Sequence, residues 1–159
     1  SHKPELREMF TNLLGASMNS EVVDEHPAFV EIIKQLSSDE CKMLKYLYED
    51  NIMPMMKMRI KLGEGKGEID ATPYFSDICY TTGCHYPQKF PEYLDNLRRL
   101  GLVEVYYDRF LTNDEYYVKL KEHVAFVKVI ADEKTTVIEK KSKYELSELG
   151  KKFCSVCLE

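Results

Sequence analysis

The sequence predicts a helix-rich α+β fold with a winged-helix-like core, and three features of the chain lead to this prediction. Residues 90–100 form a helix with clear start and stop signals, and Gly101 separates it from a strand-like segment at 102–107. A second strand-like segment, 136–146, follows later in the chain. It leads into a last helix that repeats the pattern Leu-x-x-Leu-Gly. This order of helix, strand, returning strand and helix is typical of winged-helix domains.

Two amphipathic helices precede this core, and we assign them to an N-terminal helical hairpin, residues 1–36, that packs on a domain at 37–159. Pro4 suits the first turn of the first helix, and Pro27 opens the second. Apolar residues spaced by three or four positions give each helix one hydrophobic face. They are Leu6, Met9, Phe10, Leu13 and Leu14 in the first helix and Phe29, Ile32, Ile33 and Leu36 in the second. Because the chain begins abruptly at a helix, we expect it to be part of a longer protein.

Three further helices are expected to form a tri-helical core, at residues 38–50, 73–82 and 90–100. Ser37 and Glu40 have the spacing of a capping box, which marks the start of the first of these helices. The third helix directs three leucines toward the core, namely Leu94, Leu97 and Leu100.

Between the first two core helices, residues 56–62 alternate between apolar and cationic side chains. Met56, Met58, Ile60 and Leu62 occupy one phase, and Lys57, Arg59 and Lys61 occupy the other. This alternation predicts a half-buried strand with a cationic outer face. It favours core packing for the methionines over a soft-metal site or an adaptable binding surface. The glycine-rich turn at 63–67 lacks the Gly-Lys-Ser/Thr ending of a phosphate-binding loop, so we expect no nucleotide there.

The connection between the two paired strands carries a helical insertion near 112–131, which is unusual for a wing. Thr112 and Glu115 have capping-box spacing. Tyr117, Leu120, Val124 and Val127 fall on one face of the expected helix. The insertion could pack against the N-terminal helices or against another subunit.

Four tyrosines gather around this insertion and form a candidate interaction surface, namely Tyr106, Tyr107, Tyr116 and Tyr117. Tyrosine is enriched in protein interfaces because its ring offers contact area and its hydroxyl is polar. The alternative is that these side chains only anchor the insertion to its own core. On the first interpretation we expect a protein partner or self-association.

The charge balance disfavours duplex nucleic acid as a partner. The chain has 27 acidic against 22 basic residues, a net charge of -5, whereas a duplex binder needs clustered cations to release counterions. Glu92 and Asp95 also lie on the helix that would enter a DNA groove. The alternative hypothesis of a DNA-binding face rests on a set of cations, namely Lys57, Arg59, Lys61, Arg98, Arg99, Lys140, Lys141 and Lys143.

No catalytic, cofactor-binding or metal site is expected, and we predict that the protein is not an enzyme. An enzyme or zinc site remains an alternative that the fold would have to assemble, for example from Asp77, His85 and Glu92. Cys154 and Cys157 have CxxC spacing, but helical i,i+3 spacing in the last helix predicts reduced, packed thiols.

The expected compartment is a reducing cytoplasm. The chain has five cysteines and no secretion signal. It also has no apolar run that approaches the roughly 18–20 residues of a membrane span.

Several stretches of the sequence resemble the abortive infection alpha family of bacterial proteins. The resemblance is carried by residues 26–40, 44–47, 93–102 and 146–154, and it covers residues 5–157. It implies a bacterial cytoplasmic protein that acts in phage defence. Family members are often longer at the N terminus, with a helical and sometimes glycine-rich segment, which would make this chain the sensor or adaptor part. The shared motifs are caps and core positions, so they carry no catalytic residues across.

Two hypotheses for the function follow. The first is a non-enzymatic interaction or sensor module of a phage-defence protein, and the second is a DNA-binding winged-helix regulator. The acidic charge and the mixed signs on helix 90–100 favour the first. The cationic strand face at 56–62 and the basic run at 140–143 favour the second.

Overall fold

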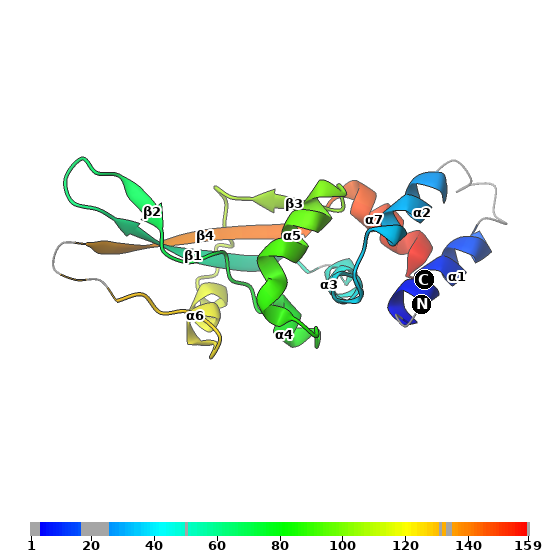
Figure 1. Cartoon of the computed structure of the whole chain (residues 1–159), viewed down its shortest axis with the longest axis horizontal. Helices are drawn as coiled ribbons and strands as arrows, with labels where there is room; N and C mark the ends of the chain where they lie inside the picture. Colours follow the sequence, from blue (N-terminus) through cyan, green and yellow to red (C-terminus); the bar gives the residue numbers. More distant parts are fainter. Residues whose placement is uncertain (1–3, 17–25, 50, 131, 133–134, 159) are drawn as a thin grey trace. The chain divides into compact units, whose positions relative to one another are not determined.

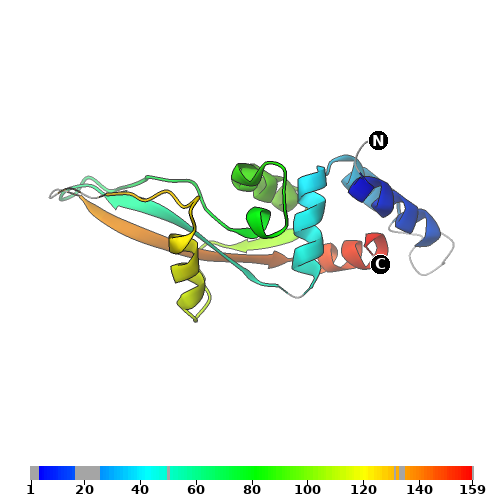
Figure 2. The ribbon, with the colours of Figure 1, turned by 90° about the horizontal axis from the view of Figure 1, so that it is seen from below.

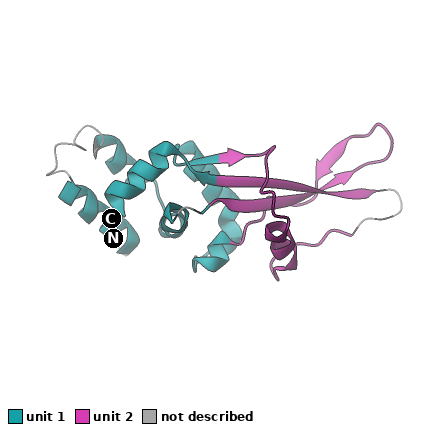
Figure 3. Ribbon diagram, turned by 180° about the vertical axis from the view of Figure 1, so that it is seen from behind, with its two compact units in different colours: residues 1–51, 78–104, 145–159 teal, residues 52–77, 105–144 magenta. Residues whose placement is uncertain are grey.

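The computed structural model describes residues 4–16, 26–49, 51–130, 132 and 135–158 (Figure 1). Over these residues the fold is α+β, as predicted, with seven α-helices, one short 3-10 helix and a four-stranded sheet. Contacts within the chain define two units, shown in different colours in Figure 3. Unit 1 comprises residues 1–51, 78–104 and 145–159, and unit 2 comprises residues 52–77 and 105–144.

Unit 1 contains the two helices predicted near the N terminus. They are α1 (Pro4–Ala16) and α2 (His26–Lys34), and α1 packs against α2, α3 (Ser38–Tyr48) and α7 (Glu148–Cys157). Their predicted apolar faces supply part of the core, since Met9, Leu13, Phe29 and Ile33 are buried. The rings of Phe29 and Phe153 meet edge to face, with their centroids 5.3 Å apart.

The capping box predicted at the start of α3 is confirmed. The hydroxyl of Ser37 accepts a hydrogen bond from the Glu40 backbone N–H, and the Glu40 carboxylate accepts one from the Ser37 N–H at 2.8 Å. These two bonds satisfy amides that have no partner inside the helix. The helix ends at Tyr48, close to the predicted end at residue 50.

The helix predicted at 73–82 is shorter than expected. Only α4 (Ile78–Thr81) is helical, and it is followed by the 3-10 helix η2 (Pro87–Lys89) and by α5 (Phe90–Arg99). The reason is that the backbone of Phe75 pairs with that of Met56, through N–H···O bonds of 2.8 and 2.9 Å, and cannot also be helical. Helix α5 matches its prediction, and it buries Leu94 and Leu97 while Leu100 is half-buried.

The repeated Leu-x-x-Leu-Gly pattern has a packing explanation in unit 1. Ser147 begins α7, its N–H donates to the Leu102 carbonyl at 2.9 Å and its hydroxyl donates to the Gly101 carbonyl at 2.6 Å. The start of α7 therefore lies against the turn that ends α5. A β-carbon at Gly150 would lie 2.0 Å from the Leu102 oxygen, so only glycine fits at this contact.

The four strands follow the order β2-β1-β4-β3 in one sheet. They are β1 (Met53–Lys61), β2 (Glu68–Asp70), β3 (Val103–Tyr106) and β4 (Thr136–Leu146). Strands β1 and β4 are antiparallel, from Met53 opposite Tyr144 to Lys61 opposite Thr136. The prediction that segments 102–107 and 136–146 pair is confirmed, because β3 and β4 are neighbours. Strand β2, which forms a hairpin with β1, was not predicted.

Strand β1 begins earlier than predicted and contains a proline. Pro54 lies opposite Lys143 of β4. Alternate residues of a strand direct their backbone groups to the same side. The N–H of Met56 donates to Phe75 rather than to β4, so the nitrogen of Pro54 also faces away from β4. The ladder between β1 and β4 therefore loses no hydrogen bond to the proline.

Along the charged part of β1, buried apolar side chains alternate with more exposed cationic ones, as predicted. Met56 and Met58 are buried, Lys57 and Arg59 are half-buried, and Lys61 is exposed. The two methionines join a hydrophobic cluster with Tyr117, Leu120 and Phe126. This packing confirms the core interpretation of the methionines.

The predicted insertion is a shorter helix than expected. Helix α6 (Glu115–Glu122) packs against β1 within unit 2 (Figure 2), and the chain from residue 123 to residue 130 is irregular. The capping box predicted at Thr112 is wrong, because the side chain of Asn113 accepts the bond from the Glu115 N–H instead. Val124, predicted on the buried face, is 99% exposed because the helix has already ended.

Candidate functional site

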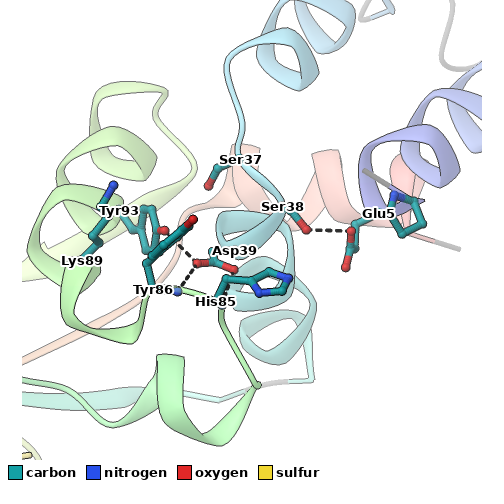
Figure 4. Close-up of a pocket in the computed structure, with 9 residues that line it drawn as sticks. Glu5, Ser37, Ser38, Asp39, His85, Tyr86, Lys89 and Tyr93 are labelled. Atoms are coloured by element: carbon teal, nitrogen blue, oxygen red, sulfur yellow. Dashed lines mark hydrogen bonds between the residues drawn. The ribbon is translucent and has the colours of Figure 1, made fainter. Parts of the chain in front are cut away.

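A pocket of about 430 Å³ opens in unit 1, where α1, the start of α3, the segment before α5 and α5 itself come together (Figure 4). The capping box holds the first turn of α3 in place, and Pro87 and Pro91 set the turn between η2 and α5. The residues that line the pocket are Pro4, Glu5, Ser37, Ser38, Asp39, His85, Tyr86, Lys89 and Tyr93.

The carboxylate of Asp39 lies at the centre of this pocket and is almost fully buried. One oxygen accepts a 2.9 Å hydrogen bond from the His85 backbone N–H. The other accepts bonds from the Tyr86 backbone N–H at 2.9 Å and from the Tyr93 hydroxyl at 2.7 Å. Figure 4 shows these bonds converging on the carboxylate. A buried carboxylate with three donors is a satisfied group, and it ties segment 85–93 to α3.

The electrostatics of the pocket keep Asp39 ionised. Burial alone raises the pKa of its carboxyl, but the three hydrogen bonds, with Lys42 4.0 Å away, lower the pKa below its ordinary value. Burial and the same carboxylate raise the pKa of the Tyr93 hydroxyl well above its usual range. Tyr93 is therefore a permanent donor and Asp39 a permanent acceptor at neutral pH.

The rim of the pocket carries aromatic surface and charges of both signs. The Glu5 carboxylate accepts a 2.7 Å bond from the Ser38 hydroxyl, which lowers the pKa of Glu5. The Lys89 ammonium lies 4.9 Å from the centroid of the Tyr86 ring, and Tyr86 is 54% exposed. An exposed aromatic ring and charges of both signs therefore surround the Asp39 carboxylate.

Two polar groups of the pocket already have hydrogen-bond partners. The buried carboxylate of Asp39 accepts from three donors, and the Ser37 hydroxyl accepts from the first turn of α3. Within the described ranges, no group of three or more His, Cys, Asp or Glu side chains is arranged to hold a metal ion.

The structure shows what surrounds the cations proposed for a nucleic-acid face. In unit 2, Lys57 pairs with Asp70 at 3.1 Å, Lys140 with Asp108 at 3.0 Å and Lys141 with Asp114 at 2.7 Å. Arg59 lies 3.5 Å from both Glu68 and Asp70. Lys61 is exposed, and the Lys143 ammonium lies 5.4 Å from the centroid of the Tyr106 ring. Arg98 and Arg99 belong to α5 in unit 1.

The predicted tyrosine surface requires one correction. Tyr117 is only 1% exposed, so it is a core residue. Its hydroxyl donates to the Ser142 carbonyl and accepts from the Leu111 N–H, both at 2.9 Å. Tyr116 is exposed on α6, whereas Tyr106 and Tyr107 are half-buried. The anchoring alternative therefore holds for Tyr117, because the helical face that it shares with Leu120 packs against β1.

Two other predicted groups can be placed. Cys154 and Cys157 are buried free thiols on the inner side of α7, as predicted, and burial raises the pKa of each to about 12. His85 lines the pocket in unit 1, and Asp77 belongs to unit 2.

Sequence reasoning missed the three side chains that build the pocket, namely Asp39, Tyr86 and Tyr93. An acid in the first turn of a helix is ordinary, because it favours the helix dipole. No local pattern pairs Asp39 with amides 46 and 47 positions later in the chain.

The fold and the pocket define an α+β protein with a pocket lined by polar and aromatic side chains in unit 1. The chain belongs to the abortive infection alpha family, because the sequence model of that family matches residues 1–157. Membership associates it with abortive infection, the defence in which an infected bacterium stops phage multiplication.

Two further comparisons bear on the fold. No curated protein matches the chain. Among solved structures, it resembles an uncharacterized protein from the hydrocarbon-degrading marine bacterium Alcanivorax borkumensis SK2, with a TM-score of 0.52 and 13% identity over 86% of this chain and 96% of that one. At this identity the likeness concerns the fold alone. No helix in the described part of the chain is both long and apolar enough to cross a membrane.

Proposed function

We propose that this chain is a non-enzymatic interaction module of an abortive-infection protein, and that the Asp39 pocket is where it recognises a protein partner. The observation that carries this proposal is the complete hydrogen bonding of the Asp39 carboxylate beneath an exposed aromatic rim. The carboxylate acts as an anchor that shapes the pocket rather than as a reacting group.

The rim supports a protein ligand. Tyr86 presents a large rigid ring, and its neighbours Glu5 and Lys89 offer one charge of each sign. Aromatic anchors surrounded by polar groups carry much of the binding energy in protein interfaces. A small anionic ligand is disfavoured, because the carboxylates of Glu5 and Asp39 both line the pocket.

A winged-helix-type arrangement remains part of the proposal. The order of α3, α4 and α5, followed by the paired strands β3 and β4, supports it. Duplex binding is the less favoured use of such a fold here. Four of the candidate cations already have carboxylate partners, and a cation paired with an acid releases few counterions from DNA.

Phage challenge of cells that express the complete native gene tests this proposal. Tyr86→Ala removes the aromatic rim, and Tyr80→Ala is the matched control because Tyr80 is also an exposed tyrosine of unit 1 but does not line the pocket. Loss of an interface anchor costs about 2 kcal/mol, or roughly thirty-fold in Kd. We expect defence to fail with the pocket variant alone.

Two results would contradict the proposal. One is full defence with Tyr86→Ala at wild-type protein levels. The other is micromolar binding of mixed-sequence duplex that weakens steeply with salt and falls on replacement of Lys57 or Arg59, which would favour the DNA-binding alternative.

A further inference from the structure

Helix α4 ends in a turn that brings two cysteines together. The Cys84 N–H donates to the Cys79 carbonyl at 2.9 Å, and Gly83 between them has a φ of +72°. This is the bond of the Schellman motif, in which the side chains at the two ends of the six-residue turn frequently touch. Helix α5 ends in the same way at Gly101, where the Leu102 N–H donates to the Leu97 carbonyl at 3.0 Å. In α4 the corresponding pair is Cys79 and Cys84.

The two thiols of this pair have different environments. The Cys79 thiol is fully buried, whereas Cys84 is half-buried. The Thr82 hydroxyl lies 3.4 Å from the Cys84 sulfur. The interaction of the Cys84 sulfur with the Cys79 thiol, with help from the Thr82 hydroxyl, lowers the pKa of Cys84 to about 7, while the same interaction and burial raise the pKa of Cys79. Cys84 is therefore the more acidic thiol of the pair.

We propose that Cys84 is an oxidation site for a hydroperoxide and that Cys79 resolves the product as an intramolecular disulfide. In the first step the Cys84 thiolate attacks one oxygen of hydrogen peroxide, the O–O bond breaks, and a sulfenic acid and hydroxide form. In the second step the Cys79 sulfur attacks the sulfenic sulfur and releases water. Overall, two thiols and one peroxide give one disulfide and two waters.

The position of the pair links this chemistry to the pocket. Cys84 directly precedes His85 and Tyr86, whose backbone amides hold the Asp39 carboxylate. The Cys84 thiol itself donates a hydrogen bond to the Asp39 carbonyl, with 3.7 Å between sulfur and oxygen. A disulfide fixes the dihedral angle about the S–S bond near 90°, so oxidation constrains both side chains next to the segment that holds Asp39. The inference goes beyond the proposed function, because the oxidation can be measured whatever binds the pocket.

Peptide mapping of the folded protein, before and after hydrogen peroxide, tests the proposal. We expect a Cys79–Cys84 disulfide, while Cys154 and Cys157 remain thiols although they are closer in sequence. These two cysteines are the internal control, since both are buried and protonated. Before oxidation, Cys84 should be alkylated by iodoacetamide at pH 7 roughly a hundred-fold faster than Cys154.

Two variants separate the steps. Cys79→Ser should leave a sulfenic acid on Cys84 that dimedone captures, and Cys84→Ser should leave Cys79 unoxidised. Equal alkylation rates for Cys84 and Cys154, or peroxide treatment that yields no Cys79–Cys84 disulfide in the wild-type protein, would overturn the proposal. The pair would then be only the packing contact of a helix terminus. The wild-type mapping decides the matter even if a variant fails to fold.

Discussion

The hydroxyl of Tyr93 on α5 donates a 2.7 Å hydrogen bond to the carboxylate of Asp39 at the start of α3. The same carboxylate holds the backbone of the two residues after Cys84. One buried acid therefore joins two helices and the segment between α4 and η2. Because the bonds are made inside unit 1, they shape the pocket directly.

Replacement of Asp39 by Asn should destabilise the protein by about 1–3 kcal/mol. Asparagine keeps one acceptor oxygen, but its NH2 group is itself a donor. It would face at least one of the N–H and O–H donors around position 39, and that donor would have no acceptor. Urea unfolding at pH 7 measures the effect as a lower midpoint with an unchanged slope. Tyr93→Phe is the control, since it removes one donor of three and should cost less.

The effect should depend on pH with a defined sign. The folded-state pKa of Asp39 is lowered, so its contribution is complete above the unfolded value of about 3.9 and is lost as the pH falls through the lower folded value. The difference in stability between the wild type and Asp39→Asn should therefore shrink in acid. The comparison isolates Asp39 from Glu5, whose pKa is also lowered. A difference that grows below pH 4 would contradict the assignment.

Tyr117→Phe should destabilise unit 2 by about 1–3 kcal/mol although it preserves the ring. The lost hydroxyl leaves the Leu111 N–H and the Ser142 carbonyl without their bonds at a buried position. Tyr116→Phe on the exposed side of α6 is the matched control and should change little. Equal effects in thermal unfolding of the two variants would show that the Tyr117 hydroxyl is not buried as described.

Local signals in the sequence predicted those elements whose cause is local. The Ser37–Glu40 capping box and the Met56–Met58 alternation depend on neighbours a few residues apart, and both were predicted correctly. The extent of helices was less predictable. The backbone of Phe75 forms an antiparallel bridge with Met56, which is 19 positions earlier, so the first half of the expected helix at 73–82 is not helical.

The candidate site was unpredictable for the same reason. The donors to Asp39 come from residues 85, 86 and 93, and only the folded chain brings them to α3. For Tyr117 the local pattern was correct, and the assignment to a surface was wrong. Its helical spacing with Leu120 indicated a buried face, yet interface statistics for tyrosine placed it in a surface. The periodicity was the better guide, because it reflects packing of this chain.

Gly150→Ala should destabilise unit 1 by about 1–3 kcal/mol, because the new methyl group would overlap the Leu102 carbonyl. Gly15→Ala is the control within the same unit. Nothing lies within 4 Å of a β-carbon at Gly15, and alanine favours helix by about 1 kcal/mol. Thermal unfolding should give opposite signs for the two variants. Stabilisation by Gly150→Ala would disprove the close contact between α7 and the turn after α5.

Site-specific photo-crosslinking in phage-infected cells tests the central claim most directly. A photoreactive amino acid replaces Tyr86 at the pocket rim or, as the control, Tyr80 on α4 of the same unit. The account predicts a discrete protein adduct at position 86 that is absent at position 80 and is lost when Asp39→Asn is added. No adduct at position 86, or the same adducts at both positions, would contradict it.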